Sequence, residues 1–304
     1  MIPYAQLRRS SRIALAGAIP LPAPLTVYVE PTNRCNLSCS FCPQSLADYR
    51  ERAGYWEHID MGLYRKVVAE LATMGLKSLK LYFFGEPLLH PHIGEIVRLA
   101  KTACTRVELT TNAMPLTERT AQELIDAELD YLRVSVYSDI QHPENVIRNV
   151  RRLYELRGAR KRPFIFAKVF NLQEQQAVSV SYTGIVDEVG VEGLHSIGSD
   201  MIQIGRLAGP QIACPYPFYN LVVRSDGNVV PCCVAWETSL IIGNVKDQTL
   251  AEIWRGEKLA AIHRLHLAGQ GRSLAACHSC DTIFNSPDNV DSLSVEEYEK
   301  RRNA

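Results

Sequence analysis

Three cysteines in the first part of the chain are the residues best suited to chemistry. Cys35, Cys39 and Cys42 form a C-x3-C-x2-C triplet directly after the strand-like residues 26–30. Thiolates are soft metal ligands, and three of them on one loop leave one coordination position of a metal centre unfilled. A structural zinc site needs a fourth nearby ligand, and the next cysteine, Cys104, lies far downstream. The spacing therefore favours a reactive centre over structural zinc.

The triplet resembles the signature of the radical S-adenosylmethionine (SAM) superfamily. In that family, three cysteines bind a [4Fe-4S] cluster whose fourth iron binds the amino and carboxylate groups of SAM. Phe41, just before the third cysteine, matches the aromatic residue that the family has there. The resemblance implies that Cys35, Cys39 and Cys42 ligate a cluster and that Phe41 lies at the cofactor.

A second motif follows the second expected strand. The run Phe-Gly-Glu-Pro at 84–87 resembles the G-G-E-P motif of the family, with phenylalanine in place of the first glycine. The resemblance implies that Gly85 and Glu86 contact SAM, and a carboxylate binds an ammonium group through charge-assisted hydrogen bonds. Asn112 and Ser135 stand where related enzymes bind the carboxylate or ribose of the cofactor. A purely structural role as turn residues stays open for both.

Composition limits the range of partners. The chain has 304 residues, 46% of them hydrophobic, and equal numbers of basic and acidic residues, 33 of each. Without a basic excess we expect no nucleic-acid partner, and no apolar stretch is long enough to suggest a membrane span. The nine cysteines are grouped as metal ligands are in a reducing compartment. We expect a cytoplasmic protein, although the apolar run 13–19 after Arg8, Arg9 and Arg12 mimics a short secretory signal.

Strand-like and helix-like segments alternate after the first cysteines, which predicts βα units and a parallel sheet. The expected strands span residues 26–30, 78–83, 106–111, 131–137, 163–170 and 193–204. The expected helices begin after an N-cap at Asp60, span 93–101, 117–126 and 175–189, and include one with Val146, Val150 and Leu153 on a single face. The resemblance implies an α/β fold, the partial (β/α)6 TIM-like barrel of radical SAM enzymes.

A second cysteine set lies near the end of the chain. Cys214 and Cys232 flank a predicted hairpin with its turn at Asp226, and Cys277 and Cys280 form a C-x2-C pair. The set resembles the first half of a SPASM domain, and its lack of later cysteines matches the shorter twitch variant. The resemblance implies that these four cysteines ligate one auxiliary [4Fe-4S] cluster, while a four-cysteine zinc site remains an alternative.

These motifs predict a division of the chain into three segments. We expect an N-terminal extension at 1–25, a radical SAM partial barrel at 26–206 and a small α+β twitch domain at 207–304. The spacing of the second set is similar to that of twitch enzymes of the 2-deoxy-scyllo-inosamine dehydrogenase type, which act on a cyclitol in natural product biosynthesis.

The resemblance implies that a flavodoxin- or ferredoxin-type reductant supplies electrons and that a 5′-deoxyadenosyl radical abstracts a substrate hydrogen. The auxiliary cluster would accept the next electron, so that a hydroxyl of a sugar or aminocyclitol becomes a ketone. Such a reaction needs a base, and Lys168, Tyr137 and Glu237 are candidates. Cys233 either packs or donates a hydrogen atom. The rivals are an epimerase or decarboxylase on the same substrate class, a peptide-modifying enzyme and a non-catalytic zinc module.

Overall fold

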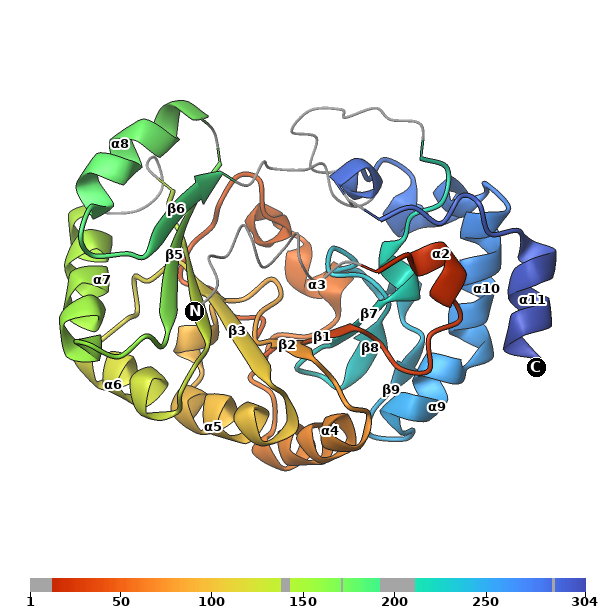
Figure 1. Cartoon of the computed structure of the whole chain (residues 1–304), viewed down its shortest axis with the longest axis horizontal. Coiled ribbons are helices and arrows are strands. Elements are labelled where there is room, and N and C mark those ends of the chain that lie inside the picture. The colour runs from red at the N-terminus through yellow and green to blue at the C-terminus, as the bar shows by residue number, and fades with distance from the viewer. Residues whose placement is uncertain (1–12, 138–142, 171, 192–210, 286–287) are drawn as a thin grey trace.

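The computed structural model describes residues 13–137, 143–170, 172–191, 211–285 and 288–304. Its described residues form one sheet of nine strands, in the order β6-β5-β4-β3-β2-β1-β7-β8-β9. Figure 1 shows this sheet as a curved surface with helices along its outer side. The sheet passes without interruption from the first part of the chain into the last.

Six parallel strands of the described chain form the partial barrel that the sequence predicts. They are β1 (Thr26–Val29), β2 (Ser78–Lys80), β3 (Arg106–Thr111), β4 (Tyr131–Ser135), β5 (Phe164–Val169) and β6 (Glu188–Val191). The helices between them are α3 (Tyr49–Ala53), α4 (Met61–Thr73), α5 (Ile93–Ala103), α6 (Glu118–Asp126), α7 (Pro143–Arg157) and α8 (Leu172–Tyr182). Asp60 caps α4 as expected, because its side chain accepts a hydrogen bond from Leu63 N.

Alternation along the strands separates two faces of the sheet. Val27, Leu79 and Val107 are 0% exposed and belong to the core that α4 and α5 cover. Successive side chains of a strand point to opposite faces, so Tyr28 and Lys80 lie on the inner face. This inner face therefore carries polar side chains.

The last unit of the barrel differs from the prediction. The helix expected over 175–189 ends at Tyr182, and residues 188–189 belong to β6 instead. Gly184 has a φ of +74°, a left-handed conformation that commonly ends a helix. The strand expected at 193–204 lies outside the described residues.

The C-terminal segment extends the same sheet. Strand β7 (Asn220–Val223) pairs in parallel with β1, and β8 (Asn228–Val230) and β9 (Gly243–Asn244) follow antiparallel. The predicted hairpin is confirmed, with Asp226 Oδ1 accepting from Asn228 N at 2.9 Å in its turn. Helices α9 (Leu250–Arg255), α10 (Glu257–Leu267) and α11 (Val295–Arg302) cover this segment.

Short 3-10 turns complete the described structure. They are η1 (Pro43–Ser45), η2 (Pro87–Leu89), η3 (Tyr216–Phe218), η4 (Thr238–Leu240), η5 (Gly271–Ser273), η6 (Ala275–Cys277) and η7 (Thr282–Asn285).

The described N-terminal residues pack on the C-terminal segment. Helix α2 (Leu15–Ala18) contributes Leu15 to a buried cluster with Phe218 and Tyr298, and Arg301 donates to the carbonyl oxygen of Ala16 at 2.9 Å. Figure 1 shows α2 beside the last helices. Among the described residues, no helix combines the length and the apolar character needed to cross a membrane.

Candidate active site and auxiliary cluster site

The loop that carries the first cysteines is fixed by hydrogen bonds from neighbouring segments. The Asn33 side chain donates to Tyr55 O at 2.7 Å and accepts from Glu57 N at 2.9 Å. The Gln44 amide donates to Asn33 O and to Phe84 O, each at 2.7 Å. Backbone polar groups of an irregular loop need such partners, because an unpaired one is costly to bury. The loop therefore has a defined shape before any ligand binds.

The thiols of this loop lie in a partly apolar setting. Burial raises the pKa of Cys35, and it raises the pKa of Cys42 to about 12. Charges on Cys39 and Cys35 would raise the pKa of Cys42 further, which shows that the three thiols are within electrostatic reach of one another. Only a positively charged centre makes three thiolates favourable here. The donor set thus fits the cluster that the resemblance implies.

Gly85 brings the second motif against the cysteine loop. A Cβ atom at this position would lie 1.9 Å from Thr32 O and 2.9 Å from Arg34 O. Next to it, Glu86 N donates to Arg34 O at 2.8 Å. Only glycine allows this backbone approach, which places the strand end beside Cys35.

The carboxylate of Glu86 is occupied by protein partners. One oxygen accepts from Leu88 N at 3.0 Å and from Thr111 Oγ1 at 2.7 Å, and the other accepts from Asn112 N at 2.7 Å. Burial raises the pKa of Glu86 to about 7, against the opposing effect of these hydrogen bonds. The side chain thus ties the end of β2 to the end of β3. Its contact with the SAM amino group stays a prediction.

Other predicted cofactor residues meet at the same strand ends. Asn112 donates from Nδ2 to Asn36 Oδ1 on the cysteine loop at 2.9 Å. Ser135, at the end of β4, is 2% exposed. The ring of Phe41 lies 5.3 Å from that of Tyr137 and 5.6 Å from that of Phe170, centroid to centroid. Cysteine loop, β3, β4 and β5 therefore converge as the sequence predicts for a parallel sheet.

Two of the four candidates for proton or hydrogen transfer lie near this convergence. Lys168 pairs in register with Ser135, and its Nζ lies 4.9 Å from the ring centre of Phe170. Tyr137 stacks on Phe170 with ring centres 5.0 Å apart. Burial raises the pKa of Tyr137, so this phenol stays protonated at neutral pH and acts as a hydrogen-bond donor.

The other two candidates lie elsewhere. Glu237 forms an ion pair with Arg52 of α3, and its role as a base stays a prediction. Cys233 lies by Tyr28 and Lys80 on the inner face of the sheet. A hydrogen bond with Cys232 lowers the pKa of Cys233, and the positive charge of Lys80 and the Tyr28 hydroxyl act in the same direction.

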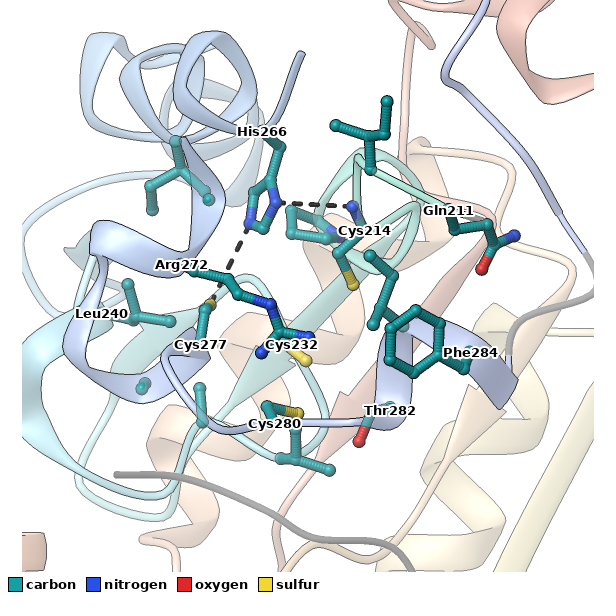
Figure 2. Close-up of a pocket in the computed structure, with 18 residues that line it drawn as sticks. Gln211, Cys214, Cys232, Leu240, His266, Arg272, Cys277, Cys280, Thr282 and Phe284 are labelled. Carbon is teal, nitrogen blue, oxygen red and sulfur yellow. Dashed lines mark hydrogen bonds between the residues drawn. The ribbon is translucent and has the colours of Figure 1, made fainter. Parts of the chain in front are cut away.

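The second cysteine set surrounds one pocket, which Figure 2 shows. Its four cysteines come from three segments of the chain: Cys214, Cys232 and the pair Cys277 and Cys280. The remaining walls are largely apolar and include Leu240. Cys233 is not among the residues that line this pocket.

The chemistry of this pocket suits a metal centre. Burial raises the pKa of Cys214 and Cys280, and that of Cys277 to about 12, and the other thiols of the set contribute to the rise for Cys214 and Cys277. Four thiols in one pocket suit an iron-sulfur cluster or a zinc ion.

Sequence reasoning missed three residues in these sites. His266 lies in the auxiliary pocket with its ring between Cys214 and Cys277 (Figure 2). Its place in the apolar pattern of α10, four residues after Ile262, was the available signal. Tyr28 and Lys80 face each other across β1 and β2, with Lys80 Nζ donating to Tyr28 Oη at 3.2 Å. Alternation within each strand could have placed them on the inner face.

Comparisons with known families cover both cysteine sets. Residues 29–162 match the model of the radical SAM superfamily, and residues 214–281 match the SPASM model, an iron-sulfur cluster-binding domain. The chain belongs to the radical SAM superfamily. It is a radical SAM enzyme with a SPASM domain, and these two domains are the kinds that bind SAM and iron-sulfur clusters.

Several proteins resemble this radical SAM enzyme along most of its length. The S-adenosyl-L-methionine-dependent 2-deoxy-scyllo-inosamine dehydrogenase of Niallia circulans is 24% identical over 261 residues, covering 84% of this chain and 92% of that protein. A PqqA peptide cyclase of Methylobacterium nodulans is 29% identical, covering 86% of this chain and 79% of that protein. The crystal structure of BtrN in complex with AdoMet and 2-DOIA superposes with a TM-score of 0.60 at 20% identity, covering 89% of this chain and 97% of that one.

Proposed function

We propose that this enzyme oxidises a hydroxyl group of a sugar or aminocyclitol to a ketone. The observation that carries the proposal is the similarity to a dehydrogenase along 84% of this chain and 92% of the relative. The set of four cysteines that lines one pocket supports it. We also propose that the SPASM domain of this chain has the shorter twitch form.

Cysteines of the two sets would hold two [4Fe-4S] clusters, one on Cys35, Cys39 and Cys42 and one on Cys214, Cys232, Cys277 and Cys280. When bound, SAM and these clusters supply a 5′-deoxyadenosyl radical that abstracts one substrate hydrogen and an acceptor for the second electron. The chain itself must position the substrate C–H bond, exclude water and take the hydroxyl proton.

The inner face of the sheet supplies groups that suit a polyhydroxylated substrate. Lys80 donates to Tyr28, and Arg133 donates from its Nη1 to Tyr82 Oη at 2.9 Å. The rings of Tyr28 and Tyr82 meet edge to face at 5.3 Å. Hydroxyl groups need such paired donors and acceptors when water is removed from them. We infer that the substrate binds over these residues.

The proton of the substrate hydroxyl needs an acceptor near the inner face. Lys168 is the candidate whose position at the end of β5 suits that role best, whereas the ion pair with Arg52 disfavours Glu237. A lysine acts as a base only when its pKa is lowered, which a dry, substrate-filled site would do. Tyr137 would then orient the hydroxyl as a donor.

Further assignments follow from the same proposal. Clusters that must be reduced require a flavodoxin- or ferredoxin-type partner and a reducing, cytoplasmic setting. The balanced charge of the chain, with 33 basic and 33 acidic residues, disfavours a nucleic-acid substrate. We place the change from barrel to twitch domain at 206–207 and the end of the N-terminal extension at 25.

A product analysis tests the proposal. The enzyme is reconstituted anaerobically with iron and sulfide, reduced with dithionite and incubated with SAM and a panel of aminocyclitols that includes 2-deoxy-scyllo-inosamine. We expect one ketone and one 5′-deoxyadenosine for each SAM consumed. Release of an epimer with solvent deuterium at the reacting carbon would instead identify a redox-neutral enzyme, with Cys233 as its hydrogen donor.

The similarity to a PqqA peptide cyclase makes peptide modification the second function that the experiment must distinguish. If SAM is consumed only when a peptide is added, and no aminocyclitol or sugar turns over, the enzyme modifies peptides. A protein that holds zinc and does not cleave SAM under dithionite would exclude all of these activities.

A further inference from the structure

His266 lies between two cysteines of the auxiliary pocket. Its ring is carried by α10 and is 3% exposed. Cys214 N lies 3.4 Å from Nδ1, and Cys277 Sγ lies 4.0 Å from Nε2. Figure 2 shows both contacts as dashed lines on opposite sides of the ring. The imidazole therefore connects two segments that each carry a proposed cluster ligand.

The contact with Cys214 decides which ring nitrogen carries the proton. A backbone N–H can only donate, so Nδ1 must accept and cannot hold a hydrogen. An imidazole that accepts a hydrogen bond at Nδ1 is the neutral tautomer, and its single proton lies on the other ring nitrogen. That proton is on Nε2, the nitrogen that faces Cys277 Sγ. The ring is thus arranged as a donor to sulfur.

Packing holds the ring in this orientation. A Cβ atom on Gly271 would lie 2.2 Å from Nδ1 and 2.5 Å from Cε1 of His266, so glycine at 271 is what leaves room for the ring. A second buried histidine on the same helix, His263, is engaged elsewhere. Its Nδ1 lies 2.8 Å from Tyr298 Oη and its Nε2 lies 2.9 Å from Pro217 O.

We propose that His266 is a positioning residue of the auxiliary cluster, whose Nε2–H donates a hydrogen bond to the Cys277 thiolate and makes the cluster easier to reduce. The reduced cluster carries one more negative charge than the oxidised one. A donor aimed at a ligand sulfur stabilises that charge, and hydrogen bonds to sulfur are among the factors that set cluster potentials. This inference rests on the proposed function, in which the auxiliary cluster accepts an electron from the substrate.

The test measures the auxiliary cluster alone in the full-length chain. Cys35, Cys39 and Cys42 are replaced by alanine, and the reconstituted protein is titrated electrochemically with electron paramagnetic resonance detection. We expect His266→Leu to keep about four iron atoms per chain and to shift the midpoint potential to more negative values. His266→Gln, whose amide can donate from nearly the same place as Nε2, should restore most of the potential.

His263→Leu is the matched control, because it removes a buried histidine of the same helix that does not itself line the pocket and contacts it only through Pro217 O. It should leave the potential unchanged. Equal potentials for His266→Leu and the parent protein, at equal iron content, would overturn the proposal, as would equal shifts in the His266→Leu and His263→Leu variants. Loss of iron from His266→Leu but not from His266→Gln would support it, since the donor alone then retains the cluster.

The experiment distinguishes a failure of the cofactor assignment from a failure of this inference. If the parent protein with the triplet removed binds no iron-sulfur cluster, the assignment of the second cysteine set is wrong, and the inference about His266 falls with it. If that protein binds the cluster but the potential does not respond to His266, only the inference is wrong.

Discussion

Gly85 is the residue at which the two motifs of the active site touch, and it gives a sharp test. In Gly85→Ala the new Cβ would lie 1.9 Å from Thr32 O and 2.7 Å from Thr32 C, both backbone atoms. Such overpacking costs about 1–3 kcal/mol or more and must displace the cysteine loop. We expect iron to fall from about eight to about four atoms per chain and SAM cleavage to be lost.

Gly17→Ala is the control for that substitution, because a Cβ atom added at this position in α2 would meet no atom within 4 Å. It should retain both clusters. Full iron content and normal SAM cleavage in Gly85→Ala would show that the two loops are not in close contact.

Glu86 predicts a pH dependence of stability. Its pKa is raised from 4.5 when unfolded to about 7 when folded, chiefly by burial. The folded state therefore holds this proton more tightly, and the resulting stabilisation is complete below about pH 4.5 and is lost as the pH rises through 7. The loss amounts to about 3 kcal/mol, since one pKa unit corresponds to about 1.4 kcal/mol.

The comparison with Glu86→Gln isolates this contribution. Denaturant unfolding of the metal-free protein is measured from pH 4 to pH 8 in both forms. The difference in the free energy of unfolding between the two should change by about 3 kcal/mol across this range. A constant difference would show that Glu86 does not titrate in this way.

Spacing in the sequence identified the cysteines and the glycine-glutamate motif, but it could not identify the partners of Glu86. Thr111 and Asn112 lie 25 and 26 residues away on another strand, and only the folded sheet brings them together. The same holds for His266, whose contact with Cys214 spans 52 residues.

At the scale of elements, the residue that follows β1 is joined to the segment after α3 and to the hairpin turn. Tyr55 Oη donates to Glu30 Oε2 at 2.6 Å, and Ser225 N donates to the same oxygen at 3.1 Å. Glu30 is 0% exposed, and burial raises its pKa. In Tyr55→Phe this carboxyl group loses a partner beneath the cysteine loop, which should destabilise the fold by about 1–3 kcal/mol.

Tyr64→Phe is a matched comparison, since that phenol donates to the backbone oxygen of Ile96 at 2.8 Å. A hydrogen bond to a neutral acceptor of this kind contributes about 1 kcal/mol to the stability of the fold. Chemical denaturation of both variants measures which of them loses more stability. A smaller loss in Tyr55→Phe than in Tyr64→Phe would contradict the role given to Glu30.

The elements themselves were largely predictable, because apolar periodicity reports which face of a strand or helix is buried. Strand β3 has the expected bounds, and Asp60 caps its helix. The predicted end of α8 was wrong, because Gly184 stops the helix before the apolar pattern changes. The pairing of β1 with β7 could not be predicted, since it joins strands nearly 200 residues apart and local patterns carry no record of it.

At the scale of the whole molecule, the pairing of β1 with β7 joins the barrel and the C-terminal strands into a single body. Residues from both sides of this junction share one buried core, which includes Val27 and Leu221. We expect a fragment of residues 1–206 to aggregate, because β1 would become an exposed edge strand. Co-expression with 207–304 should restore a soluble complex, assessed by gel filtration and circular dichroism. A folded, monomeric fragment of residues 1–206 would contradict this view.

This single body also keeps the two cysteine sets in a fixed relation, so removing one should leave the other working. In Cys280→Ala the first cluster and the inner face of the sheet remain, while the auxiliary pocket loses one of its four thiols. If the proposed function is correct, deuterium at the reacting carbon of the substrate should still pass to 5′-deoxyadenosine, because that step needs only the first site. The yield of ketone should fall at least about 100-fold, because the substrate radical then lacks its electron acceptor. Each addition of about 1.4 kcal/mol to the activation free energy lowers the rate tenfold. Cys104→Ala, which removes a buried thiol that donates to Arg106 O at 3.3 Å outside both sites, should leave both readouts unchanged. Normal ketone formation in Cys280→Ala would show that the electron leaves by another route.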